Sequence, residues 1–227
     1  VQWCKWALLK KILRAYAHRA PENCGGDSQP DALAKRWISH VFSKYFGKYE
    51  GSFVLYDLGK DAWSIHDIEH ATLRVAPDST YKIYDALFGL EEGVITPEDS
   101  FIAWNGENYP FEAWNADQTL QSAMTSSVNW YFQSIDEQLA STNIYNYIQQ
   151  IGYGNENVSG DLSTYWLESS LKISPVEQVE LLMKLQNNSL GFSSENINAV
   201  KNSILLSSSE AGSFYGKTGT GRVDGHD

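Results

Sequence analysis

Apolar and polar residues repeat with two different periods along the chain. Residues 52–57 have the apolar run of a strand and residues 62–66 alternate as a returning strand, on either side of the turn Gly59-Lys60-Asp61, which predicts a β-hairpin over residues 52–67. In most of the remaining chain the apolar positions recur every three to four residues, which predicts helices, whereas residues 213–220 have the pattern of a strand. The predicted helical segments are residues 31–46, 80–90, 117–151, 175–185 and 194–206.

The order of these elements indicates the fold class. A hairpin, a long run of helices and a final strand do not form the alternating strand–helix–strand pattern of a parallel sheet. We therefore expect an α+β fold, in which an antiparallel sheet is assembled from both ends of the chain and is covered by helical layers.

Residues 1–30 differ from the rest of the chain. Residues 1–19 contain five basic side chains and no acidic one, and on a helical wheel their apolar residues share one face. Two interpretations are open for this basic amphipathic segment: it lies on an anionic membrane surface or beside a membrane span, or it is an ordinary surface helix. Residues 21–30 are typical of a linker, so we divide the chain into residues 1–30 and a domain of residues 31–227.

Composition limits the classes of function. The 227 residues include 28 acidic and 17 basic side chains, which gives a net charge of −11 and argues against a nucleic-acid partner. Hydrophobic residues make up 42% of the chain, enough for a globular core, but no apolar run reaches the roughly 18 residues of a membrane helix. Cys4 and Cys24 are too few for a disulfide scaffold, and neither they nor the five histidines match a metal motif, so no metal site is predicted.

The first candidate for chemistry is the Ser-x-x-Lys tetrad Ser79-Thr80-Tyr81-Lys82, at the start of a predicted helix. This spacing places the lysine amine on the same helix face as the serine hydroxyl, one turn away. The lysine can accept the serine proton if burial lowers its pKa or if its amine is converted to another acid–base group. The tetrad alone is not diagnostic, because Ser169-Ser170-Leu171-Lys172 has the same spacing.

Two further motifs follow along the chain. Ser127-Val128-Asn129 offers a hydroxyl for proton transfer beside Lys82 and an amide for a substrate carbonyl. Lys217-Thr218-Gly219-Thr220 lies on the last predicted strand, where its lysine and hydroxyls suit an anionic carboxylate and its glycine lets a ligand approach the backbone. The backbone N–H groups of Ser79 and Thr220 would then form a two-donor oxyanion hole. Viewed singly, each motif is also compatible with an ordinary helix or strand end.

In this order, the three motifs match the signature of penicillin-recognising serine acyltransferases. Tyr153-Gly154-Asn155, and Trp166-Leu167-Glu168 ahead of Leu171-Lys172-Ile173-Ser174-Pro175, resemble class D β-lactamases. The block that begins Ser127-Val128-Asn129-Trp130 resembles its counterpart in the extracellular sensor domains of bacterial β-lactam sensor–transducer receptors. The resemblance extends from about Gly51 to Thr220 and implies the fold shared by serine β-lactamases and penicillin-binding transpeptidases.

The resemblance implies a role for each motif. Ser79 is the serine that a β-lactam acylates, Lys82 is the base, in class D enzymes as an N-carboxylated lysine formed with CO2, and Ser127 relays the proton. Trp166 corresponds to the tryptophan that supports this carbamate, although a buried core aromatic is an equally ordinary role. The residues that would bind the substrate are Asn129, Lys217, Thr218, Gly219 and Thr220.

Asn129 separates two functions, because class D hydrolases usually have valine at this position. A polar amide beside Lys82 favours loss of the carbamate, and without the carbamate the water that hydrolyses the acyl adduct is not activated. A persistent adduct suits a receptor that must stay occupied in order to signal. We therefore expect the sensor domain of a β-lactam-responsive receptor for antibiotic resistance, with little turnover. A class D-like hydrolase and an inactive truncated remnant are the alternatives.

The resemblance also predicts what surrounds the domain. The chain ends shortly after the Lys-Thr-Gly strand, where family members continue with further strands and a C-terminal helix, so we expect a truncated fold with unprotected sheet edges. The receptors also carry membrane helices and a cytoplasmic zinc protease with a His-Glu-x-x-His motif, which this sequence lacks. The expected partners are β-lactam antibiotics and membrane segments of the same receptor. The expected location is the outer face of a bacterial cell membrane, or alternatively a secreted or periplasmic one.

Overall fold

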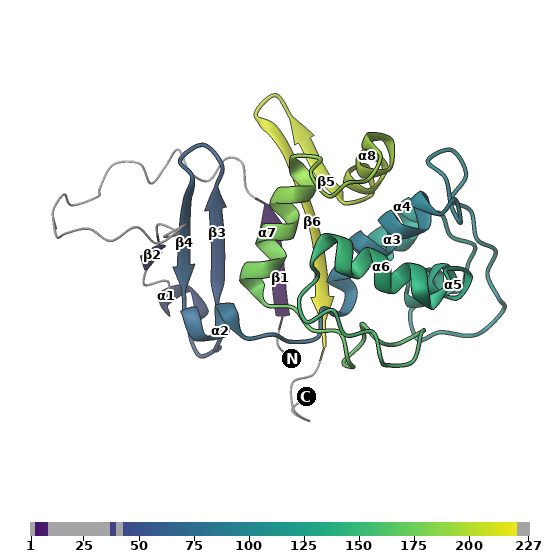
Figure 1. The fold of residues 1–227 in the computed structure, drawn as a ribbon, viewed down its shortest axis with the longest axis horizontal. Helices are drawn as coiled ribbons and strands as arrows, with labels where there is room; N and C mark the ends of the chain where they lie inside the picture. Colours follow the sequence, from purple (N-terminus) through teal and green to yellow (C-terminus); the bar gives the residue numbers. More distant parts are fainter. Residues whose placement is uncertain (1–2, 9–36, 40–42, 222–227) are drawn as a thin grey trace, which may run out of the picture.

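The computed structural model describes residues 3–8, 37–39 and 43–221. A β-hairpin region lies at one end of the molecule, a second sheet crosses the middle, and most helices gather at the other end (Figure 1). The described residues thus form an α+β fold, as predicted, but the single sheet expected from both chain ends was wrong, because the 52–67 hairpin and the Lys-Thr-Gly strand lie in two separate three-stranded sheets.

The predicted hairpin is confirmed. Strands β3 (Phe53–Asp57) and β4 (Ala62–His66) pair in antiparallel register, with Val54 opposite Ile65. A short strand, β2 (Trp37–Ser39), pairs in parallel with the other edge of β4, and it is followed by α1 (Ser43–Phe46). The prediction of a helix over residues 31–46 was therefore wrong at β2, because hydrogen bonding to the free edge of β4 outweighs a weak local preference.

The second sheet is built around β6 (Gly212–Thr220). Strand β5 (Leu205–Ser209) pairs with one side of β6 and β1 (Trp3–Leu8) with the other, both antiparallel. The start of residues 1–30 is thus a strand and not a helix, while residues 9–30 lie outside the described part. Our expectation of an unprotected sheet edge beside the Lys-Thr-Gly strand was also wrong on this side, because β1 pairs with the backbone groups of β6.

Helices occupy the chain between the hairpin and β5. The predicted segments 80–90, 117–151 and 175–185 are confirmed, whereas the segment 194–206 ends as a helix at Ser203 and continues as β5. The helices are α2 (Ile68–Thr72), α3 (Lys82–Glu91), α4 (Leu120–Ser126), α5 (Asn129–Gln138), α6 (Ser141–Ile151), α7 (Pro175–Gln186) and α8 (Ser194–Ser203), with short 3-10 turns η2 (Asp78–Thr80) and η3 (Glu112–Trp114).

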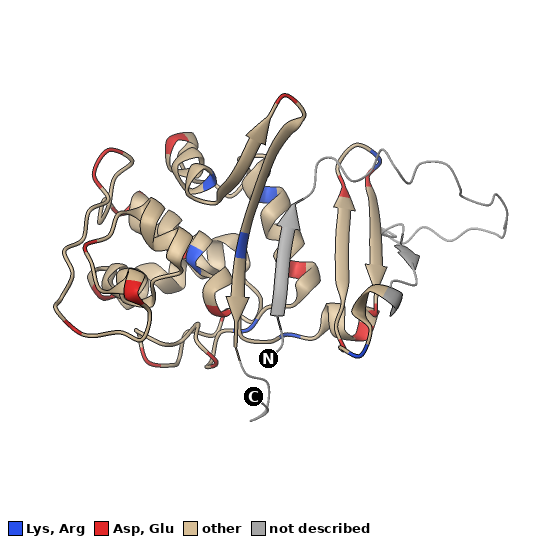
Figure 2. Ribbon diagram, turned by 180° about the vertical axis from the view of Figure 1, so that it is seen from behind, with Lys and Arg blue, Asp and Glu red and all other residues tan. Residues whose placement is uncertain are grey.

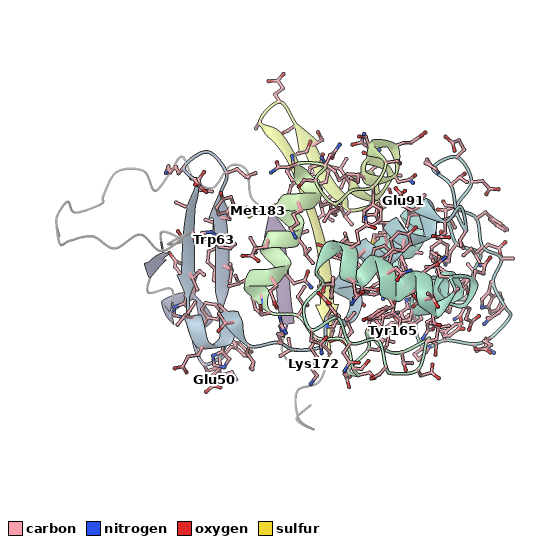
Figure 3. All side chains as sticks on the ribbon, viewed as in Figure 1. Glu50, Trp63, Glu91, Tyr165, Lys172 and Met183 are labelled. Carbon is pink, nitrogen blue, oxygen red and sulfur yellow. The ribbon has the colours of Figure 1, made fainter. Side chains whose placement is uncertain are left out.

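The main core surrounds α3. Every residue of α3 from Lys82 to Leu90 is buried, and Gly89 lies so close to α5 that an added Cβ would stand 2.6 Å from the Ile135 side chain. A smaller apolar core joins the hairpin to α7, where Trp63 and Met183 lie between these two elements (Figure 3). Arg74 lies in the segment between α2 and η2, and its Nε donates to Glu177 Oε1 of α7 at 3.0 Å. This contact holds the segment against the same helix. Helix α7 therefore connects the two cores.

Charged residues are unevenly placed over this framework. Acidic positions are spread along the loops and helix ends of the helical region (Figure 2). In the described part of the chain, no helix is long and apolar enough to cross a membrane. The same residues contain no group of three or more His, Cys, Asp and Glu side chains placed to hold a metal ion.

Candidate active site

The Ser79 hydroxyl lies at the N-terminal end of the helical segment formed by η2 and α3. The preceding residue, Asp78, has a left-handed backbone with a φ of 46°, which is costly for a residue other than glycine. This conformation is held from both sides, because the Asp78 N–H donates to the Trp166 carbonyl at 3.0 Å and the Glu168 N–H donates to Asp78 Oδ1 at 3.3 Å. Ser79 itself is only partly buried, so its hydroxyl stays accessible.

Lys82 joins three elements at one point. It is fully buried one helical turn after Ser79, and its Nζ lies 2.7 Å from Ser79 Oγ. The same nitrogen lies 3.3 Å from Ser127 Oγ and 2.5 Å from Asn129 Oδ1. The structure therefore brings together the first two motifs, which are separated by more than forty residues in the sequence.

Burial lowers the pKa of Lys82 well below its ordinary value, and the nearby positive charge of Lys217 lowers it further. The carboxyls of Asp85 and Asp78 act in the opposite direction but more weakly. A lowered pKa favours the neutral amine, which has a lone pair with which to accept the Ser79 proton.

The backbone around Ser127 is fixed by two tryptophans. Ser127 follows α4 with a left-handed φ of 54°, and Asn129 begins α5. Trp114 Nε1 donates to the Ser126 carbonyl at 3.0 Å, and Trp130 Nε1 donates to the Trp114 carbonyl at 2.8 Å. These bonds hold the turn in place, so the side chains of Ser127 and Asn129 both face Lys82.

Strand β6 forms the opposite wall of the site. Lys217 is buried, and its Nζ donates to Ser127 Oγ at 2.8 Å, which places the third motif against the second. Burial lowers the pKa of Lys217 to about 8. Thr218 and Thr220 are exposed. Gly219 permits the close approach of β6 to η2, because an added Cβ would lie 3.0 Å from Thr80 Cγ2.

Trp166 packs against Lys82 but directs its N–H elsewhere. The ring is fully buried, and its centroid lies 5.0 Å from Lys82 Nζ. Its Nε1 donates to Asp136 Oδ2 at 2.8 Å. Trp166 is therefore adjacent to the lysine, as predicted, while its single N–H donor is bound to a carboxyl that the sequence analysis did not consider.

That carboxyl belongs to a buried acidic pair, Asp85 and Asp136, which sequence reasoning missed. Burial raises the pKa of Asp136 to about 7 and that of Asp85 well above its ordinary value, and the two side chains interact. Tyr165, labelled in Figure 3, donates its hydroxyl to Asp136 Oδ1 at 3.0 Å. The signal was present in the sequence as two acidic residues on apolar faces of predicted helices, but their partners lie on distant elements.

The competing tetrad Ser169–Lys172 does not resemble a catalytic site. It lies in the irregular segment that precedes α7, and the Lys172 side chain is exposed at the edge of the molecule (Figure 3). Lys172 is exposed whereas Lys82 is fully buried, so the surroundings of the two lysines distinguish the two sequence matches.

Known proteins resemble both the sequence and this fold. Residues 59–227 match the model of the penicillin binding protein transpeptidase domain. The chain is 44% identical to the regulatory protein BlaR1 of Bacillus licheniformis, over 81% of this chain and 31% of that protein. It also matches the solved C-terminal domain of the Bacillus licheniformis BlaR penicillin-receptor, with a TM-score of 0.82 and 41% identity, over 86% of this chain and 80% of the other. A class D β-lactamase from Bacillus subtilis matches with a TM-score of 0.77 and 35% identity, over 80% of this chain and 76% of that one. The chain spans 31% of the length of the first curated relatives.

Proposed function

The chain belongs to the family of penicillin-binding transpeptidase domains and is a homologue of the BlaR1 and MecR1 sensor domains, and from this premise we propose that it captures β-lactam antibiotics as an ester on Ser79. The observation that carries the proposal is the position of the buried Lys82 amine, 2.7 Å from Ser79 Oγ and within reach of Ser127. In this arrangement a nucleophile, its base and a proton relay form one connected set.

The proposed reaction uses each of these groups once. Neutral Lys82 accepts the hydroxyl proton as Ser79 Oγ attacks the lactam carbonyl carbon. The lactam C–N bond then breaks, and the proton passes through Ser127 to the departing nitrogen, which leaves an acyl ester on Ser79. The N–H groups of Ser79 and Thr220 would stabilise the developing oxyanion.

Strand β6 would orient the drug. The Lys217 ammonium attracts the carboxylate of the β-lactam, and the exposed hydroxyls of Thr218 and Thr220 lie on the same strand to share it. Gly219 keeps this strand close to the turn that carries Ser79, so the carboxylate and the reacting carbonyl are held at the same time.

We further propose that the adduct persists, so that the domain acts as a sensor with little turnover. Asn129 Oδ1 accepts a hydrogen bond from Lys82 Nζ at 2.5 Å. This contact stabilises the uncarboxylated lysine and competes with its conversion to the carbamate that would activate a hydrolytic water. Because β-lactamases are also among the relatives, hydrolysis of the adduct is the alternative that must be tested.

The setting of the domain is also a proposal. Its BlaR1 and MecR1 relatives are about three times longer than the matched segment, which covers 31% of them. We propose that the site faces the outside of a bacterial cell and that acylation is reported through membrane segments of the same receptor.

A fluorescent penicillin tests capture directly. Wild-type chain should retain the label through denaturing electrophoresis, and the variant Ser79→Ala should not, whereas Ser169→Ala should label like wild type. A chromogenic cephalosporin then separates the two activities. A single stoichiometric burst supports the sensor, continued colour formation over many equivalents supports the hydrolase, and no label on the wild type overturns the proposed function.

A further inference from the structure

Asp78, the residue before the nucleophile, combines a left-handed backbone with a buried carboxyl. Its φ of 46° is a conformation that glycine, asparagine and aspartate adopt at the lowest cost. Of these three residue types aspartate alone brings a charge, and Asp78 is only 8% exposed. Burying a carboxylate is costly, so the shape of the turn explains the backbone of Asp78 but not its charge.

The carboxyl of Asp78 lies between two other segments of the site. Its Oδ1 accepts a hydrogen bond from the Glu168 N–H at 3.3 Å. Its Oδ2 lies against the residue after β6, where a Cβ added to Gly221 would stand 2.0 Å from it. The Asp78 N–H donates to the Trp166 carbonyl at 3.0 Å. The backbone and the side chain of Asp78 therefore hold the two ends of the segment Trp166–Glu168.

This segment has a costly backbone of its own and borders the base. Glu168 is left-handed, with a φ of 48°, and the Trp166 ring centroid lies 5.0 Å from Lys82 Nζ. The hydrogen bond between Glu168 and Asp78 thus joins two backbones that the surrounding structure must hold in place. It connects the turn that carries Ser79 to the segment that contacts Lys82.

The charge of Asp78 changes in mild acid. Burial raises the pKa of its carboxyl to about 7, the hydrogen bond from Glu168 lowers it, the Glu168 charge raises it and Lys82 lowers it. Burial also keeps the pKa of the neighbouring Tyr153 phenol well above its ordinary value, so this group stays neutral. Among the described residues, the chain after β6 faces the carboxyl with the backbone of Gly221. A protonated carboxyl is a weaker acceptor than a carboxylate.

We propose that Asp78 is a positioning residue whose ionised carboxylate holds the Ser79 turn against the segment Trp166–Glu168, so that capture of a β-lactam slows in mild acid. This inference rests on the proposed function and adds a pH control to the same site. When the carboxyl is protonated, the bond to Glu168 weakens and the Ser79 hydroxyl is held less accurately relative to Lys82.

The loss of reactivity in acid is separate from unfolding. A carboxyl whose pKa is raised in the folded state is destabilised there by ionisation. The contribution of Asp78 to stability therefore increases as the pH falls through about 7, while its hold on the Ser79 turn decreases. Melting temperatures measured at each pH distinguish the two effects.

The pH dependence of acylation tests the proposal. Labelling of the wild-type chain by a fluorescent penicillin should slow about tenfold or more between pH 7.5 and pH 5.5. Asp78→Asn keeps the tolerance for a left-handed φ and an acceptor for the Glu168 N–H but cannot ionise, so its rate should change by less than about threefold. The two profiles should cross, with the variant slower at pH 7.5 and equal or faster at pH 5.5.

Asp67→Asn is the matched control. Asp67, at the start of α2, also has a left-handed φ, of 55°, and its Oδ1 accepts a hydrogen bond from the His70 N–H at 3.2 Å. The substitution makes the same chemical change outside the site, so this variant should follow the wild-type profile.

Protonation of Lys82 is the competing cause of a fall in acid. A fall that persists unchanged in Asp78→Asn belongs to the lysine and overturns the proposal. An equal loss of rate at every pH, with an unshifted profile, shows a merely structural role and overturns it as well. Glu168→Gln decides the question if Asp78→Asn does not fold. The Glu168 charge acts on Asp78 rather than on Lys82, so the fall should move to lower pH, and an unmoved profile contradicts the proposal.

The backbone amide of Glu168 gives a readout that needs no drug. Because this N–H donates to Asp78, its proton NMR shift in the full chain should change with a midpoint near pH 7, and Asp78→Asn should lose this step. A wild-type resonance without the step overturns the inference. Failure of the proposed function is a different result, seen as an absence of fluorescent label on the wild type at every pH, and the NMR titration does not depend on it.

Discussion

The helical region and the hairpin region bury their side chains for different purposes. The hairpin core consists of apolar residues from β3, β4, α2 and α7, and the described hairpin contains no fully buried charged side chain. The core around α3 is larger and encloses Lys82, Asp85 and Asp136. Burying charged groups is costly. Among the described residues they are concentrated in the core around α3, which indicates that this core gives up some stability for chemical function.

This difference predicts which substitutions affect which property. Changes in the α3 core at the charged positions should alter acylation with little loss of stability. Changes in the hairpin core should alter stability with little effect on acylation. The following substitutions test the contrast, beginning with the largest expected effect.

Lys82→Met should reduce the rate of Ser79 acylation about a thousandfold, because removal of a general base costs between about a hundredfold and ten thousandfold. The melting temperature should not fall, since a buried amine is replaced by an apolar side chain of similar size. Stopped-flow labelling and thermal melts measure the two effects. Lys172→Met, in the exposed tetrad, is the matched control and should change neither; equal losses in both variants would contradict the assignment.

Trp63→Ala should destabilise the protein by about 3 kcal/mol or more, because it removes a large buried side chain from the hairpin core. Acylation per folded molecule should stay at the wild-type rate. Leu58→Ala, at an exposed position of the hairpin turn, should shift stability by less than about 0.5 kcal/mol. If Trp63→Ala slowed acylation as strongly as it lowered stability, the two regions would not be separable.

Gly219→Ala should slow acylation about tenfold, because its Cβ would press on Thr80 and on the Pro77 carbonyl and displace β6 from Ser79. Gly59→Ala places the same methyl group in the hairpin turn, 3.4 Å from Asp57 Oδ1, and should leave the rate unchanged. Labelling kinetics measure both. An unchanged acylation rate in Gly219→Ala would show that β6 can move away from Ser79 without slowing the reaction, and would contradict this role of Gly219.

The acylation rate constant should fall as the pH rises above about 8, approaching a tenfold loss per pH unit. The pKa of Lys217 is lowered to about 8, so its amine is positive below this pH and neutral above it, where it no longer attracts the drug carboxylate. Lys217→Arg keeps its charge at high pH and should shift the fall upward. A rate that is flat from pH 7 to pH 10 would contradict the role of Lys217.

Sequence patterns predicted the elements whose signal is local. The hairpin has an apolar strand, a turn and an alternating return strand, and the helices that carry Ser79, Lys82 and Asn129 have clear apolar periods, so their positions followed from the chain. The motifs also led us to expect the Ser127 hydroxyl beside Lys82, and the structure has Ser127 Oγ 3.3 Å from Lys82 Nζ. The chemical roles of these residues remain predictions.

The features that were missed depend on distant partners. Strand β5 is exposed along its whole length and rich in serine, so it has no alternation to detect. Strands β1 and β2 form because neighbouring strands offer free backbone groups, which no local pattern reveals. The surroundings of Asp85 and Asp136 are formed by Trp166 and Tyr165, which donate hydrogen bonds to Asp136. These two residues follow the acids by tens of positions, so the local sequence does not reveal the cluster.

The lifetime of the acyl adduct tests the central claim most directly. The chain is reacted with benzylpenicillin, free drug is removed, and the intact mass is followed over time. The account predicts one added drug molecule per chain, located on the peptide that contains Ser79, which remains for hours. An adduct that disappears within seconds, or a wild-type chain whose mass never changes, would contradict it.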